Sequence, residues 1–115
     1  MKSPFEAALA TLIRHRGVMG SMVVSEQDGI IVDSTLQIGV KGKAVAALAA
    51  SLYRKARQAA LAAGLGDAGF LQLEAERGRI CAVGRNELVL VAITDAGANL
   101  GLLRVEMLRA VPALE

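Results

Sequence analysis

Few side chains in this chain are of types that carry out chemistry, and they lie apart in the sequence. The 115 residues include one cysteine, Cys81, and one histidine, His15, whereas a zinc site needs several nitrogen or sulfur ligands. The counts therefore exclude such a site and an internal disulfide. We interpret Cys81 as a small core residue, because no histidine motif pairs with it. We interpret His15 as a residue at the end of a helix.

Two carboxylates could stand on one face of a predicted strand, as a paired acid–base site requires. These are Glu74 and Glu76, and Arg77 and Arg79 follow them closely. Charge pairs across a hairpin are therefore the better interpretation. The sequence offers no other catalytic arrangement, so we expect no enzyme activity, no cofactor and no metal.

Two glycine-containing stretches resemble phosphate-binding loops. The segment 64–69, GLGDAG, has G-x-G-x-x-G spacing, but a dinucleotide loop needs a strand before it and a helix after it. Here a long helix precedes and a strand follows, so a helix end and a turn explain the glycines better. The segment 42–44, GKA, lacks the hydroxyl that holds magnesium in a phosphate loop, so we reject it.

The composition indicates one folded α+β domain over residues 1–115. Hydrophobic residues make up 54% of the chain and charged residues 21%, which excludes disorder. A domain of this size leaves much of its surface exposed, so part of the apolar surplus is expected to contact a partner. No apolar run approaches the ~20 residues of a membrane helix. With a single cysteine, these features lead us to expect a cytoplasmic protein without membrane insertion.

Apolar spacing and turn residues predict the order α-β-β-α-β-β-β-α. A first helix is capped by Ser3 and stopped by Gly17, and a last helix is capped by Thr94-Asp95 and runs to about Ala110. The other predicted elements are strands at 21–24, 30–35, 70–76, 79–83 and 88–93, and a long helix at 43–63.

The long helix has two apolar faces, so it needs two surfaces to pack against. We expect the stronger stripe to pack on the sheet: Val45, Leu48, Ala49, Leu52, Ala56 and Ala59. We expect the second face, which is rich in small residues, to contact the same helix of another copy. That face consists of Ala46, Ala50, Tyr53, Arg57 and Ala60.

Charge is distributed unevenly along the chain. Between Asp33 and Asp67 there is no acidic residue, while the basic residues there are Lys41, Lys43, Arg54, Lys55 and Arg57. This stretch could steer an acidic partner, or it could simply be a solvated face that keeps the protein soluble. Tyr53 is its single aromatic residue, so we expect no nucleic-acid partner.

The order of elements and three local segments resemble the roadblock/dynein light-chain family. The segments are GSMVV at 20–24 leading to DGIIVDS at 28–34, the alanine-rich long helix, and ANLGLLR at 98–104. Because Gly101 weakens the last helix by about 1 kcal/mol relative to alanine, we expect it to permit close packing on the sheet.

The resemblance implies a fold and an assembly. The fold would be a five-stranded antiparallel sheet with the long helix on one face and the two terminal helices on the other. Family members form dimers through their long helices and third strands, which implicates Phe70, Gln72 and Glu74 together with the second face of the long helix. They have no catalytic residues of their own.

The resemblance also implies a function. Bacterial members bind and activate Ras-like small GTPases such as a gliding-polarity switch, so we expect a homodimeric regulator of a Ras-like GTPase. Its partner surface would be Lys43, Arg54, Lys55 and Gln58. A structural adaptor for a motor, sensor or filament component is the alternative. A small-molecule sensor or enzyme is a third and weaker hypothesis, because no convergent polar pocket is evident in the sequence.

Overall fold

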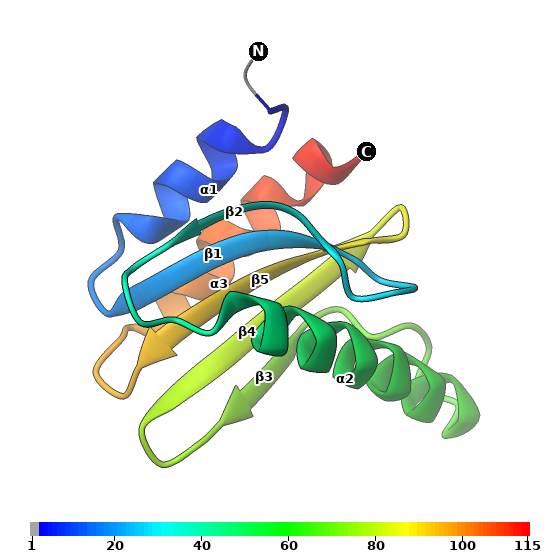
Figure 1. Ribbon diagram of the computed structural model, residues 1–115. Coiled ribbons are helices and arrows are strands. Elements are labelled where there is room, and N and C mark those ends of the chain that lie inside the picture. Colours follow the sequence, from blue (N-terminus) through cyan, green and yellow to red (C-terminus); the bar gives the residue numbers. More distant parts are fainter. Residues whose placement is uncertain (1–2) are drawn as a thin grey trace.

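Five strands form one antiparallel sheet in the computed structural model, which describes residues 3–115 (Figure 1). The sheet order is β2-β1-β5-β4-β3. The apolar strands β1 and β5 are therefore central, as their burial on both faces requires, and the more polar β2 and β3 lie at the two edges. The strands are β1 (Val18–Ser25), β2 (Ile31–Leu36), β3 (Leu71–Glu74), β4 (Gly78–Arg85) and β5 (Leu88–Asp95).

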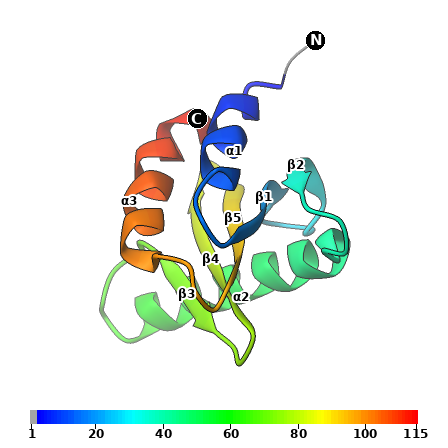
Figure 2. The ribbon, with the colours of Figure 1, turned by 90° about the vertical axis from the view of Figure 1, so that its left-hand side faces the viewer.

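Helices cover both faces of the sheet. The long helix α2 (Gly42–Ala62) crosses one face, and α1 (Glu6–Ile13) and α3 (Leu100–Ala110) lie on the other, as Figures 1 and 2 show from two sides. A short 3-10 turn, Val111–Leu114, follows α3. The predicted fold class and order of elements are confirmed.

Two clusters of buried side chains fill the spaces between sheet and helices. On the side of α1 and α3, Leu9, Leu12, Leu103 and Met107 pack on the sheet. The other cluster lies under α2 and is smaller in side-chain volume, because much of its helical half is alanine. Small side chains therefore set the distance between α2 and the sheet.

The start of α3 differs from its predicted position. β5 continues through Asp95, because Thr94 is fully buried and pairs with both neighbouring strands. The cap of α3 is instead Asn99, whose Oδ1 accepts a hydrogen bond of 3.1 Å from the backbone N–H of Leu102. The predicted Thr94-Asp95 cap is wrong because strand pairing holds those two residues in the sheet.

Cys81 is buried on β4, and burial raises the pKa of its thiol from the ordinary value of 9.0 to about 11. Because the thiol ionises more easily in the unfolded chain, its contribution to stability is complete below pH 9 and is lost as the pH rises toward 11. We expect the urea midpoint to fall over this interval, and a Cys81→Ala variant to show a smaller fall. Equal pH dependence in both proteins would contradict this prediction.

Candidate interaction surface

The face of α2 that packs on the sheet is the alanine-rich face. Ala46, Ala49 and Ala50 are fully buried, and Tyr53 is 2% exposed. The prediction that Ala46, Ala50 and Tyr53 contact another chain is therefore wrong, because these side chains are already covered by their own sheet. Small side chains let the helix backbone come close to the strands.

Tyr53 shows how closely the helix and the sheet fit. Its ring lies on Gly84 of β4, where a Cβ atom would come within 2.5 Å of the ring. The hydroxyl donates a hydrogen bond of 3.3 Å to the carbonyl of Ala68. Burial raises the pKa of this hydroxyl above its usual value. The ring therefore fixes both the C-terminal half of α2 and the loop that leads to β3.

The larger apolar residues of α2 point away from the sheet. The prediction that Leu48 and Leu52 pack on the sheet is therefore wrong. Leu48 is 61% exposed and Leu52 37% exposed. We call the set to which they belong the leucine stripe; it consists of Val45, Leu48, Leu52, Ala56 and Ala59, of which Ala59 is exposed and Val45 and Ala56 are half-buried. The sheet does not cover this stripe.

Contacts on the opposite side of α2 show which way the leucine stripe faces. Arg54 donates hydrogen bonds to the carbonyls of Glu26 and Gln27, in the turn at the end of β1. Arg54 and Leu52 lie about 160° apart around the helix, since successive residues turn by about 100°. The leucine stripe therefore faces the other end of the strands, where β1 begins.

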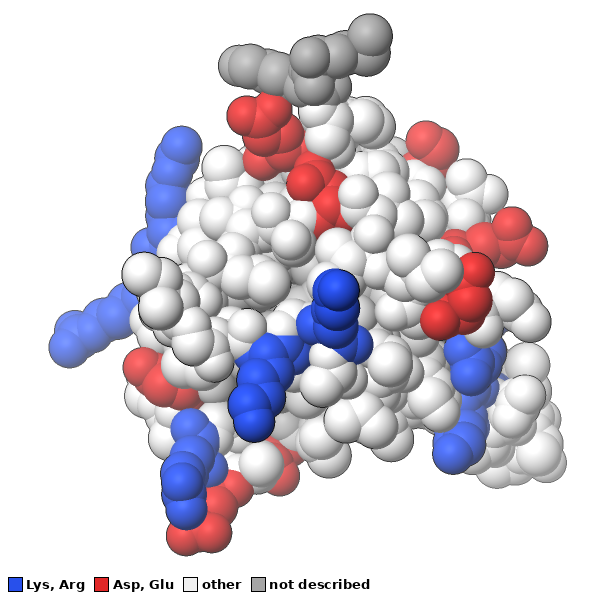
Figure 3. Space-filling view, in the orientation of Figure 1, with Lys and Arg blue, Asp and Glu red and all other residues white. Residues whose placement is uncertain are grey.

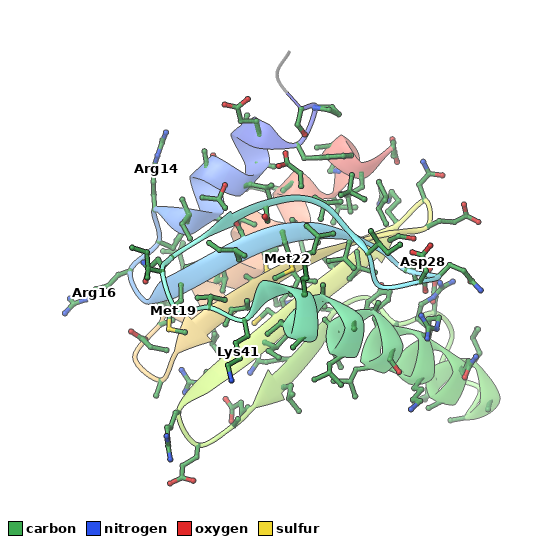
Figure 4. The ribbon with its side chains drawn as sticks, viewed as in Figure 1. Arg14, Arg16, Met19, Met22, Asp28 and Lys41 are labelled. Carbon is green, nitrogen blue, oxygen red and sulfur yellow. The ribbon has the colours of Figure 1, made fainter. Side chains whose placement is uncertain are left out.

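At that end the sheet is incompletely covered. The register aligns Gly20, Ile93, Ile80 and Leu73 in one row across four strands, and we call this the open row. Leu73 is 40% exposed, and a hollow of about 190 Å³ lies over Leu73, Ile80 and Ile93. Met22 is buried in the cluster under α2, whereas Figure 4 shows Met19 beyond the start of the helix, near Lys41.

The two edges of the sheet differ in their protection. Within the described residues the short strand β3 pairs with β4 alone, and its residues Gln72 and Glu74 are exposed. Glu74 lies 3.9 Å from Arg79 across the hairpin, as expected. On the other edge, Asp33 accepts a hydrogen bond of 2.8 Å from the N–H of Ser34 in β2. A carboxylate on an edge strand disfavours pairing with another strand, and both edges carry one. The carboxylate of Glu74 on β3 is partly neutralised by Arg79, whereas that of Asp33 on β2 has no ion pair among residues 3–115, so β3 is the more accessible edge.

Arg57, predicted to lie in the dimer interface, forms ion pairs within the chain. Its guanidinium lies 2.6 Å from the Glu26 carboxylate and 3.0 Å from that of Asp67. Hydrogen bonds to Glu26 raise the pKa of Arg57, and the bond from Arg57 lowers the pKa of Asp67. Together with Arg54, this residue holds α2 to the turn after β1 and to the loop before β3.

The other predicted partner residues do lie on the surface. Lys43, Lys55 and Gln58 are exposed along α2. In Figure 3 the basic side chains on this face form small groups that are separated by uncharged surface. With Arg54 and Arg57 engaged in the chain, the basic surface of α2 is weaker than the sequence suggests.

The two remaining predicted interface residues, Phe70 and Ala60, do not face fully outward. Phe70 is half-buried against the core cluster on the α3 side, and the guanidinium of Arg104 lies 5.3 Å from the centre of its ring. Ala60 is half-buried near the end of α2. Phe70 directly precedes β3 at the accessible edge.

A hollow of about 520 Å³ lies between Tyr53, the 63–70 loop and the β4–β5 turn. Both arginines that line it are paired within the chain: Arg57 as described, and Arg85 with Glu115 at 2.7 Å. Among residues 3–115 no three His, Cys, Asp or Glu side chains are grouped to hold a metal ion. No helix in that same range is long and apolar enough to span a membrane.

Sequence reasoning missed the leucine stripe and the open row as surface features. One signal was available in the sequence. Leu73 and Ile80 have polar neighbours in their strands, and one helix does not cover every row of a five-stranded sheet. Apolar residues at one end of the sheet could therefore be expected to stay uncovered. The two stripes of α2 could not be ranked by periodicity, because both repeat at helical spacing.

Comparison with known proteins gives a consistent result. The family described as the Roadblock/LC7 domain matches residues 4–94. The uncharacterized protein MJ0714 of Methanocaldococcus jannaschii is 35% identical over 115 residues, covering 100% of this chain and 97% of its own length.

Solved structures are similar in fold. The Roadblock/LC7 domain from Streptomyces avermitilis superimposes with a TM-score of 0.85 at 20% identity, over 96% of this chain and 94% of that one. The gliding protein MglB from Thermus thermophilus gives 0.83 at 19% identity, over 99% of this chain and 90% of its own.

Proposed function

The chain belongs to the Roadblock/LC7 domain family, and we propose that it is a homodimeric, non-catalytic module that binds and regulates a Ras-like small GTPase. One observation carries the dimer: the leucine stripe, the open row and the accessible β3 edge adjoin one another. The leucine stripe and the open row are apolar, and within residues 3–115 the outer edge of β3 has no strand beside it. One neighbouring chain would cover all three.

Symmetry explains why that neighbour is a second copy. If two β3 strands pair antiparallel, a two-fold axis perpendicular to the sheet places both α2 helices on the same face. In Figures 1 and 2 the C-terminal end of α2 extends past β3. After the rotation, the partner's helix end lies over the open row, and the two leucine stripes face each other. We therefore place Leu48, Leu52, Ala56 and Ala59 in the interface, with Gln72 and Glu74 at the paired edge.

The GTPase partner is inferred from the family resemblance. Paired α2 helices would present Lys43, Lys55 and Gln58 of both copies on one surface, where the charges of the lysines would steer an acidic patch. A second candidate is a structural adaptor in which charge plays little part. The engagement of Arg54 and Arg57 within the chain favours it, because their charges are already partnered. For either function we propose that the protein is located in the cytoplasm.

Charge reversal on α2 separates these two candidates. We expect Lys43→Glu combined with Lys55→Glu to slow association with a Ras-like GTPase from the same genome about tenfold, since exposed charges act mainly on the association rate. The unmodified pair should also associate more slowly as salt rises. Stopped-flow fluorescence with nucleotide-labelled GTPase measures both effects.

The matched control reverses Arg14 and Arg16, two exposed arginines that Figure 4 shows at the end of α1, away from α2. This variant should associate at the normal rate. Equal slowing in both double variants would indicate a general effect of net charge. A GTPase that does not bind the unmodified protein in either nucleotide state would favour the adaptor.

A further inference from the structure

The outer face of α3 carries a second apolar stripe, on the layer opposite α2. Leu102 is 49% exposed, Val105 44% and Leu108 41%. These residues recur at every third position, whereas Leu103 and Met107 face the core. Exposed apolar side chains that are aligned along one face of a helix are typical of a contact with another chain.

Gly101 adds an independent observation at one end of this stripe. It was expected to permit close packing on the sheet, but it is exposed, and a Cβ placed there would meet only Asn99 Oδ1, at 3.6 Å. The fold of this chain therefore does not require a glycine, which weakens a helix relative to alanine. A glycine at this position leaves the helix backbone accessible to close approach by another helix.

The charges around the stripe are mostly positive. Arg104 lies on one side of it and Arg109, 73% exposed in its side chain, on the other. Arg16 lines a hollow of about 120 Å³ together with Leu102. Glu106 is the acidic residue of α3, and it lies 3.5 Å from Arg109. A second copy of this face would bring arginines toward arginines, so its charge favours an acidic partner instead.

We propose that the outer face of α3 docks an acidic amphipathic helix of a partner protein. Apolar residues of that helix would cover Leu102, Val105 and Leu108, its backbone would approach Gly101, and its carboxylates would face Arg104 and Arg109. Because α3 and α2 cover opposite faces of the sheet (Figure 2), this site and the proposed dimer surface can be occupied together. The domain then bridges two partners.

A synthetic peptide tests the site directly. The probe is a helix of about 15 residues with leucines at i, i+3, i+4 and i+7 and glutamates beside them, added to ¹⁵N-labelled full chain. We expect saturable chemical-shift changes centred on α3, and about tenfold weaker binding to a Val105→Asp variant. A Leu102→Glu variant should behave similarly. Ile38→Asp, the same kind of change at a fully exposed apolar residue in the loop before α2, is the matched control and should bind normally.

The outcomes are distinct. A peptide of the same pattern with lysines in place of glutamates should bind about tenfold more weakly or not at all, and equal binding of the two peptides would overturn the proposal. Absence of saturable shifts on α3 would also overturn it. Self-association beyond a dimer that Val105→Asp abolishes would assign the face to a second copy and reject an acidic helix. None of these results alters the test of the α2 dimer.

Discussion

A Leu52→Glu variant is expected to be a folded monomer at micromolar concentration, where the unmodified protein is a dimer. Leu52 is 37% exposed in the isolated chain and lies in the leucine stripe, so its replacement leaves the chain's own core intact. In the proposed dimer a glutamate there would be buried without a partner, which costs about 3 kcal/mol or more. The dissociation constant should therefore rise about 100-fold. Light scattering coupled to size exclusion, with circular dichroism, measures both properties.

Gln58→Glu provides the matched control, because it adds the same charge to an exposed position on the other side of α2. That variant should remain dimeric. If the unmodified protein is a folded monomer at this concentration, or if both variants dimerise equally, the proposed interface is wrong.

An Ala50→Glu variant is expected to be strongly destabilised, and not simply to dissociate. Ala50 is fully buried between α2 and the sheet, in a cluster of apolar side chains around Tyr53. Burial of the charge together with overpacking should cost about 3–5 kcal/mol, a large part of the ~5–15 kcal/mol that stabilises a domain. We expect a thermal midpoint at least about 15 °C lower.

The control here is Ala59→Glu, the same substitution further along the helix at an exposed position of the leucine stripe. It should melt near the normal temperature while weakening the dimer. A normal melting temperature for Ala50→Glu would mean that the alanine face of α2 does not pack on the sheet. These two predictions thus test separately which face of α2 is internal and which is shared.

Much of the fold follows from the sequence because its signals are local. Turn residues such as Asp28-Gly29 and Arg77-Gly78 mark where strands reverse, and the unbroken apolar runs of β1 and β5 require central positions. The cross-hairpin pair of Glu74 and Arg79 follows from alternation along two adjacent strands. Each of these features depends on residues close together in the chain.

Local signals of this kind could not show which face of α2 packs on the sheet. Both of its stripes have helical spacing, and the leucine stripe is the more hydrophobic of the two. The alanine face is internal because Gly84, far along the chain from Tyr53, leaves room for the tyrosine ring on β4. Only the register of the sheet brings those two residues together.

The roles of the charged residues divide in the same way. The sequence by itself determined that the chain has a strongly basic central segment and few groups suited to catalysis. The tertiary structure decided that Arg54 and Arg57 are used to hold α2 to the turn after β1, because their partners Glu26 and Gln27 lie far before them in the chain. Periodicity specifies which residues share a face of a helix. Which surface covers that face depends on segments far away in the chain, because their side chains determine how closely the helix can approach the sheet.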